Sequence, residues 1–248
     1  MATNTVIEVR GLRKVYGETV AVQSVDLDVS RGEIFGIVGP NGAGKTTTVE
    51  CIASLRRPDA GSIRVLGLDP VADQKAVREV VGVQLQQSAL PARLRVREAL
   101  NLFAAYYPRP LSVDGLLTEW QLSDKMNTAV ASLSGGQRQR LFIALALVGN
   151  PEIVVLDELT TGLDPHVRRD TWELVQALRD RGVTVLLVTH FMDEVERLCD
   201  RVAVIAAGRV TAIGTPAELT ELAANRGAPS GTFEDTYLTL TGTGSLTI

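Results

Sequence analysis

Hydrophobic and polar residues alternate in two short stretches near the start of the chain, Val6–Arg10 and Val25–Val29. A period of two predicts strands with one exposed face, and we expect these two strands to be antiparallel. Three later stretches are almost continuously apolar, which is typical of buried strands. They are Glu33–Val38, Ile153–Glu158 and Val183–His190.

Apolar residues at helical spacing separate the strands. Val49, Ile52, Ala53 and Leu55 share one face of a predicted helix. Residues 88–150 predict three helices in succession. Their apolar faces are Val96, Leu100, Phe103 and Tyr107, ended by Pro108; Val113, Leu116, Leu117 and Trp120, capped by Ser112; and Leu141, Leu145 and Val148, in a helix that begins near Ser134.

The second half of the chain returns to alternating elements. Asp164 and Gly182 are placed to cap and to end a helix, residues 201–214 predict a hairpin, and Thr215 with Glu218 has the spacing of a capping box. We therefore predict an α/β fold in one domain over residues 1–248. Residues 1–87 and 151–220 form a core and a small antiparallel β-subdomain, 88–150 an inserted α-helical subdomain, and 221–248 a polar C-terminal tail.

Composition excludes several classes of protein. The 248 residues are 45% hydrophobic with a net charge of −4, which argues against disorder and against a nucleic-acid partner. The chain lacks both the apolar core of a signal peptide at its start and a run of about 18 apolar residues, so action at a membrane would need a separate spanning subunit. Cys51 and Cys199 lack redox or metal spacing, and we expect them to be reduced in a cytosolic setting.

A glycine-rich segment lies between a predicted strand and a predicted helix and fits G-x-x-x-x-G-K-[ST]. Its backbone N–H groups and the helix dipole favour a phosphate chain, and a mere turn would not require the lysine and hydroxyl as well. Lys45 can reach the β- and γ-phosphates, and the Thr46 hydroxyl can ligate Mg²⁺. We expect nucleotide contacts from Gly39, Pro40, Asn41, Gly42, Ala43, Gly44, Lys45, Thr46 and Thr47.

Two acids end a buried apolar strand, Asp157 and Glu158. The carboxyl edge of such a sheet is where open α/β folds bind ligands. Asp157 suits Mg²⁺, and Glu158 suits general-base work on an attacking water. Taken alone, the pair could equally be exposed loop acids; beside the lysine loop, the functional interpretation is favoured.

A second glycine-bearing turn precedes a helix at Leu133–Gln137, "LSGGQ". One nucleotide needs only one phosphate cradle, so this turn is expected to serve a nucleotide bound by another copy. The alternative is an ordinary serine cap followed by two glycines.

These motifs together resemble the nucleotide-binding subunit of ABC transporters, over about residues 5–242. The loop is similar to Walker A, "IVVLDE" to Walker B, and "LSGGQ" to the signature motif. The resemblance implies a D-loop ending at Asp164, a switch histidine at His190, and stacking of adenine on Tyr16. It also implies a Q-loop glutamine, for which we choose Gln86 over Gln84 and Gln87. Leu159 stands where the family often has proline. Leucine in place of proline removes no catalytic group.

The resemblance implies a P-loop NTPase fold, ATP and Mg²⁺ as cofactors, and two cassettes facing head to tail. It implies the following roles: catalysis by Glu158, His190, Lys45 and Gln86; metal binding by Thr46, Gln86 and Asp157; and nucleotide contacts from Ser134, Gly135, Gly136, Gln137 and Asp164. The partners would be an integral membrane permease and a second ATPase subunit, identical or related. The protein would lie at the cytoplasmic face of the membrane, and the sequence resembles the drug and ABC-2-type exporter group.

Two other functions are considered. A soluble ABC-type ATPase acting on nucleic acid or ribosomes usually carries a coiled coil or a second cassette, and neither fits in 248 residues. A binding module that signals without turnover is disfavoured by the presence of Glu158 and His190.

Overall fold

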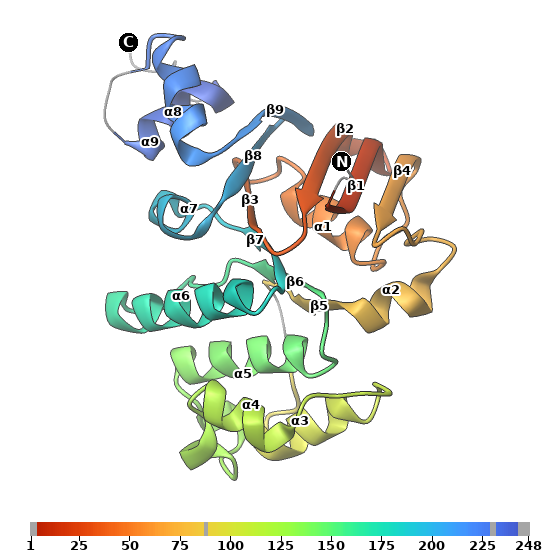
Figure 1. Ribbon diagram of the computed structural model, residues 1–248, viewed down its shortest axis with the longest axis vertical. Helices are drawn as coiled ribbons and strands as arrows, with labels where there is room; N and C mark the ends of the chain where they lie inside the picture. Colours follow the sequence, from red (N-terminus) through yellow and green to blue (C-terminus); the bar gives the residue numbers. More distant parts are fainter. Residues whose placement is uncertain (1–3, 87–88, 229–231, 243–248) are drawn as a thin grey trace.

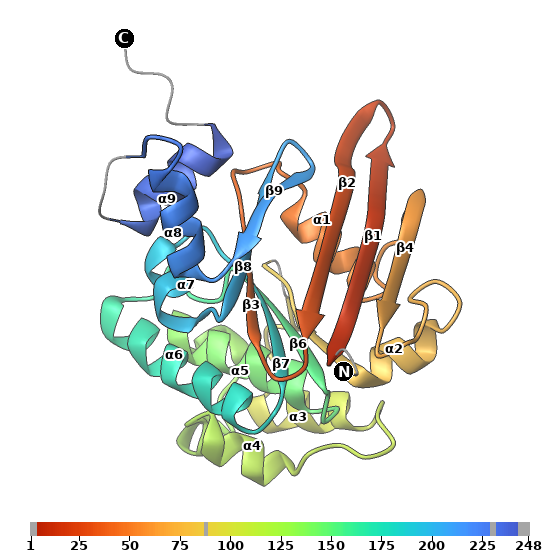
Figure 2. The ribbon, with the colours of Figure 1, turned by 45° about the horizontal axis from the view of Figure 1, so that its top comes forward.

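A computed structural model describes residues 4–86, 89–228 and 232–242 of the chain. Nine strands form one twisted sheet in the order β4-β1-β2-β9-β8-β3-β7-β6-β5 (Figure 1, Figure 2). The strands are β1 (Thr5–Tyr16), β2 (Thr19–Ser30), β3 (Ile34–Val38), β4 (Ala60–Val65), β5 (Val81–Gln84), β6 (Ile153–Asp157), β7 (Thr184–Val188), β8 (Arg201–Ala206) and β9 (Arg209–Gly214).

The helices cover both faces of the sheet. They are α1 (Lys45–Ile52), α2 (Gln74–Val80), α3 (Val96–Ala104), α4 (Val113–Glu119), α5 (Gly135–Leu147), α6 (Pro165–Asp180), α7 (Met192–Leu198), α8 (Pro216–Ala224) and α9 (Phe233–Thr241), with short 3₁₀ turns at Ser123–Lys125 and Val130–Ser132.

The five strands β8, β3, β7, β6 and β5 run parallel and form the buried core. Every residue of β3, β6 and β7 is buried, as their continuously apolar sequences predict. Alternate side chains divide between two apolar cores. Ile34 and Val38 face the core shared with the helical insertion and α6 to α9, whereas Phe35 and Ile37 face the core shared with α1 and the antiparallel strands.

The antiparallel strands predicted near the N-terminus are confirmed and extend further than the alternation alone indicates. β1 pairs with both β2 and β4, and Figure 2 shows the three strands beside one another. β2 pairs with β9 in parallel at Ser24 and Arg209. The antiparallel strands are therefore the outer part of the same sheet, and their position places the β1–β2 turn near the start of α1.

The helical insertion is attached to the sheet through α5. A Cβ atom at Gly82 would lie 2.0 Å from the carbonyl oxygen of Ala146, so β5 and α5 approach as closely as glycine allows. The buried indole of Trp120 and the buried Leu141 belong to the same apolar core as Leu156 of β6. The insertion is consequently packed on the core, and α5 carries its N-terminus to one edge of the molecule (Figure 1).

Some elements differ from the sequence prediction. α1 ends at Ile52 because Ser54 takes a left-handed conformation with φ of 59°, and Leu55 is 42% exposed instead of sharing the buried face. α3 ends at Ala104, so Tyr107 packs beyond the helix, against Gly149. The sequence analysis does not identify α2 and α7, whose short lengths give little periodicity.

The segment assigned to a polar tail contains a packed helix. Residue 220 falls inside α8, and Thr232 caps α9, whose Phe233 and Leu240 are buried. α9 packs against α7, α8 and β8, which explains why three threonines in nine residues do not prevent a helix from forming. The rest of that segment, 229–231 and 243–248, lies outside the described residues.

Candidate functional site

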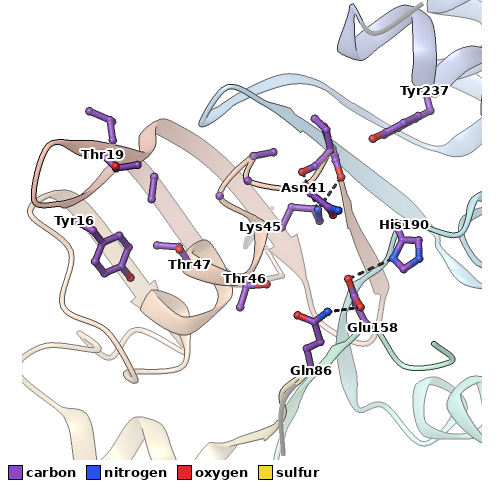
Figure 3. A pocket seen from close by; sticks show the side chains of 17 residues that line it. Tyr16, Thr19, Asn41, Lys45, Thr46, Thr47, Gln86, Glu158, His190 and Tyr237 are labelled. Atoms are coloured by element: carbon purple, nitrogen blue, oxygen red, sulfur yellow. Dashed lines mark hydrogen bonds and ion pairs between the residues drawn. The ribbon is translucent and has the colours of Figure 1, made fainter. Parts of the chain in front are cut away.

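A cavity of about 880 Å³ lies at the carboxyl edge of the parallel strands, beside the glycine-rich loop (Figure 3). The loop after β3, the turn between β1 and β2, the segment after β5 and the ends of β6 and β7 all contribute to it. The lining residues are Tyr16, Thr19, Val20, Ala21, Gly39, Pro40, Asn41, Gly42, Ala43, Gly44, Lys45, Thr46, Thr47, Gln86, Glu158, His190 and Tyr237.

The glycine-rich loop needs its glycines for close packing. A Cβ atom would lie 2.0 Å from the Ile205 carbonyl oxygen at Gly39, and 2.4 Å from the Ala21 carbonyl oxygen at Gly44. Gly44 precedes α1 with φ of 96°, a conformation that glycine adopts without the strain of a Cβ. The loop can therefore curl back between β2 and β8 and present the N-terminus of α1 to the cavity.

Lys45 lies at the floor of the cavity with its ammonium group bonded to protein carbonyls. Nζ donates to the carbonyl oxygens of Gly39 at 2.7 Å and Pro40 at 3.1 Å. Burial is the main cause that lowers the pKa of Lys45, and the nearby Asp157 and Glu158 oppose that shift. The cation is thus held inside the loop, where an anion entering the cavity would meet it.

Thr46 and Asp157 form a polar pair that fits a divalent cation. The Thr46 hydroxyl donates to Oδ2 of Asp157 at 2.9 Å, while Oδ1 is buried without a hydrogen-bond partner among the described residues. Burial raises the pKa of Asp157. Within residues 4–86, 89–228 and 232–242, no cluster of three or more His, Cys, Asp and Glu could hold a metal alone. The pair therefore suits Mg²⁺, which takes its other ligands from water and phosphate.

Glu158, Gln86 and His190 converge on one wall of the cavity (Figure 3). Nε2 of Gln86 donates to Oε2 of Glu158 at 2.6 Å, and Nδ1 of His190 lies 3.4 Å from Oε1. Glu158 has φ of 53°, an uncommon conformation for a residue with a side chain. Its own N–H bonds the Val188 carbonyl oxygen at 2.8 Å, which ties this turn to β7.

Two of the three candidate Q-loop glutamines lie within the described residues, and they occupy different places. Gln84 is buried, and its Nε2 donates to the carbonyl oxygens of Leu85 and Asp157 at 2.9 and 3.3 Å. Gln86 is the one whose amide lines the cavity. Gln87 lies outside the described residues. The end of the strand accounts for the difference, because Gln84 is the last residue of β5 whereas Gln86 lies beyond it, where the period of two no longer applies.

Two tyrosines lie on opposite sides of the cavity (Figure 3). Tyr16 is 41% exposed, with the Lys14 ammonium 5.4 Å from its ring centre, so the ring is available for stacking. Tyr237 belongs to α9 and was not predicted from the sequence. Its only sequence signal was an aromatic residue in a polar segment, and the packing of α9 brings it to a loop about two hundred residues earlier.

The remaining predicted residues do not line the cavity of their own chain. Ser134 and Gln137 form a reciprocal cap at the start of α5, with N–H to oxygen distances of 3.1 and 3.3 Å. Gly136 packs against Val167, and Gly135 has open space in front of it. Asp164 caps α6 by accepting from the N–H groups of His166 and Val167. These residues form a second, separate surface with an exposed helix N-terminus.

Sequence comparison places this chain beside known nucleotide-dependent transport proteins. The ABC transporter family matches residues 22–161. The Nod factor export ATP-binding protein I of Rhizobium etli is 42% identical over 220 residues, which is 87% of this chain and 70% of the relative. The daunorubicin resistance ATP-binding protein DrrA3 of Streptomyces coeruleorubidus is 43% identical over 221 residues, again 87% and 70%.

Solved structures share the fold over most of their length. An ATP-binding subunit of an ABC transporter superposes with a TM-score of 0.84 at 30% identity, covering 96% of this chain and all of that one. A dimeric post-hydrolysis state of an ATP-binding cassette, bound to ADP and phosphate, gives a TM-score of 0.76 at 27% identity and covers 84% and 98%.

Proposed function

This chain belongs to the ATP-binding subunits of ABC transporters, and we propose that Lys45, Glu158, His190 and Gln86 are the residues with which it hydrolyses ATP. The observation that carries the proposal is their convergence in one cavity. Lys45 comes from the glycine-rich loop, and Gln86 and His190 each lie within hydrogen-bonding or ion-pair reach of Glu158.

The proposed nucleotide lies along the cavity between Tyr16 and the Glu158 wall. Tyr16 stacks on the base, and the N–H groups from Gly39 to Thr47 surround the phosphates, where the dipole of α1 adds positive potential. Lys45 is placed to exchange its carbonyl partners for phosphate oxygens, which are stronger acceptors because they are charged.

Thr46 and Asp157 would hold Mg²⁺, although only Thr46 of this pair lines the cavity, and Gln86 is the third candidate ligand because it lines the cavity with Thr46. When bound, the ion neutralises charge that develops on the phosphates. The unpartnered Oδ1 of Asp157 is an acceptor inside the protein, and such an atom is costly to bury unless something occupies it.

Glu158 is the proposed general base. Each oxygen of its carboxylate makes one contact: Oε2 accepts a hydrogen bond from Gln86, and Oε1 lies beside Nδ1 of His190. A water held by this carboxylate would be aligned for attack on the terminal phosphate, and the carboxylate would take its proton. His190 and Lys45 would stabilise, from two sides, the negative charge that develops on the phosphate oxygens during the reaction.

The family assembles as a dimer of cassettes, and we propose that the start of α5 closes the site of a second subunit. Ser134 and Gly135 present hydroxyl and N–H groups at an exposed helix N-terminus, and neither residue lines the cavity of its own chain. Ser134, Gly136 and Gln137 would thus contact the terminal phosphate held by the partner, with Asp164 on the adjoining loop. ATP then joins the two cassettes, and its hydrolysis lets them separate.

The family works with a membrane subunit, and within the described residues no helix is long and apolar enough to cross a membrane. We propose that the permease contacts a groove of about 360 Å³ between the core and the helical insertion. The groove opens beside Gln84, so its occupant would act on the segment that carries Gln86. Its apolar walls are Ala53, Leu55, Val81, Val83, Leu90, Phe103, Tyr107, Phe142, Leu145 and Ala146.

The names of the relatives, which refer to Nod factor export and daunorubicin resistance, favour export. We propose that the chain acts at the cytoplasmic face of the membrane. The test is to tag the chain, to purify it from a detergent extract of its own cells, and to look for a membrane subunit that co-purifies with it. We expect co-purification with that subunit and Mg²⁺-dependent phosphate release. Co-purification with ribosomes in its place, or nucleotide binding without phosphate release, would contradict the proposal.

A further inference from the structure

A fully buried carboxylate lies just behind the proposed catalytic wall. Glu194 has no exposed surface and belongs to α7, four residues after His190. Its Oε1 accepts a short hydrogen bond from the hydroxyl of Thr160 and a second one, at 3.3 Å, from the indole Nε1 of Trp172. One oxygen atom thus joins three elements: α7, the loop after Glu158, and α6.

Burying the Glu194 carboxylate in this way costs folding free energy, which a contact with a purely structural role would not require. A carboxylate without exposure loses its hydration, and Oε2 of Glu194 has no hydrogen-bond partner among the described residues. Val195 and Leu198 on the same helix are buried apolar residues, and a leucine at position 194 would continue that packing. Buried polar groups of this kind fix one arrangement of the elements that they join.

The segment that Glu194 holds includes the catalytic turn. Thr160 is buried two residues after Glu158, and its carbonyl oxygen accepts from the N–H of Leu163 at 3.1 Å. Thr161 donates its N–H to the carbonyl oxygen of Glu158 at 3.3 Å. Trp172 lies on α6, which begins directly after this loop. The same oxygen atom therefore anchors the loop at Thr160 and, twelve residues later, the helix that follows it.

We propose that Glu194 is a positioning residue that locks the loop carrying Glu158 to the helix that follows His190, so that the side chains of Glu158 and His190 keep their contact on the cavity wall. His190 and Phe191 lead straight into α7, and the Phe191 N–H bonds the Thr189 hydroxyl at 3.0 Å, so a shift of α7 moves His190. The inference rests on the proposed function, because it assigns Glu194 a role through Glu158 and His190.

The test compares four substitutions by kcat, by ATP affinity and by thermal unfolding. Glu194→Leu removes the acceptor but keeps the volume, Thr160→Val removes one donor, and Glu194→Gln keeps an oxygen acceptor for both. Thr171→Val is the matched structural control, because its buried hydroxyl bonds only the Val167 carbonyl oxygen of its own helix, at 2.8 Å. Trp172 emission, obtained by subtracting the emission of a Trp172→Phe variant, reports on the contact between Trp172 and Glu194 and does not depend on ATP hydrolysis.

We expect Glu194→Leu to lower kcat by about tenfold to a hundredfold, the range for a misplaced catalytic group. Its ATP affinity should stay within about twofold of wild type, since the phosphate loop is untouched. Glu194→Gln should recover most of the activity. Thr160→Val should lower kcat less, and adding it to Glu194→Leu should cause no further loss, because both changes break the same bond.

Wild-type kcat in Glu194→Leu, or a loss no greater than that of Thr171→Val at equal stability, would overturn the proposal. If Glu194→Leu does not fold, Thr160→Val decides: an unchanged kcat there would count against the role. A different result would contradict the proposed function, namely the absence of phosphate release from the wild-type protein. In that case the role of Glu194 is tested by Trp172 emission alone. A change on adding ATP that Glu194→Leu abolishes supports the role, and an equal change in both proteins refutes it.

Discussion

Gln86 and Glu158 are joined by a hydrogen bond of 2.6 Å between amide Nε2 and carboxylate Oε2. The glutamine follows β5 and the glutamate follows β6, two neighbouring parallel strands whose carboxyl ends meet at the cavity. The groove proposed to contact the membrane subunit lies beside β5, so this bond links the proposed docking surface to the proposed general base.

Glu158→Gln removes the proposed base and keeps the size of the side chain. We expect the variant to bind ATP and to dimerise, because the phosphate loop and the α5 surface are unchanged. Turnover should fall about a thousandfold, roughly 4 kcal/mol of barrier. Phosphate release measured with a sensor under saturating ATP checks this, and near-normal turnover would remove Glu158 from its assigned role.

Lys45→Ala removes the buried cation from the phosphate loop. We expect ATP affinity to fall by about tenfold to a hundredfold, since a charge-assisted hydrogen bond is worth roughly 1.5–3 kcal/mol. Titration calorimetry gives the dissociation constant. Lys75→Ala, at an exposed lysine on α2, is the control for the loss of one positive charge. Equal ATP affinities for the two variants would contradict the proposal that Lys45 binds the phosphates.

Ser134→Arg places a long cation at the exposed start of α5. We expect the variant to bind ATP as a monomer with wild-type affinity and to lose ATP-driven dimerisation, because the surface proposed to close the partner's site is obstructed. Light scattering with ATP and the Glu158→Gln background measures the dimer. Ser123→Arg puts the same side chain at an exposed serine of the same helical insertion. Dimers of normal stability in Ser134→Arg would refute the shared site.

Tyr237→Ala opens the wall that α9 adds to the cavity. Burial raises the pKa of Tyr237 above the ordinary value for tyrosine, so its phenol, which is neutral near neutral pH in any case, remains a donor at higher pH as well. We expect ATP affinity to fall, by about tenfold or 1.4 kcal/mol at most, because one of several walls is lost. Tyr106→Ala removes a tyrosine that is 77% exposed and outside the cavity, and it should leave affinity unchanged. The same result for Tyr237→Ala would exclude a nucleotide contact.

Both cysteines should resist thiol reagents in the folded protein. Burial raises the pKa of Cys51 to about 11 and raises that of Cys199 as well. Because the thiolate is the reactive form, its fraction at Cys51 at pH 8 is about one in a thousand, and it increases as the pH rises towards the raised pKa. We expect labelling with Ellman's reagent only after unfolding, when both thiols should react. Rapid labelling of the native protein at pH 8 would show that one site is open.

The sequence alone determined the features that are encoded locally: the buried strands from their continuous apolar runs, the cap at Asp164 from its spacing, and the phosphate loop from its glycines and Lys45. Each depends on neighbours a few residues apart, whose geometry the backbone fixes. Tertiary structure decided the rest. It placed Gln86 in the cavity wall and Gln84 in the core, brought Tyr237 of α9 to the cavity, and buried Glu194 against Thr160 and Trp172. Those contacts join residues far apart in the chain, and only the packing of helices on the sheet sets their distances, which no local period records.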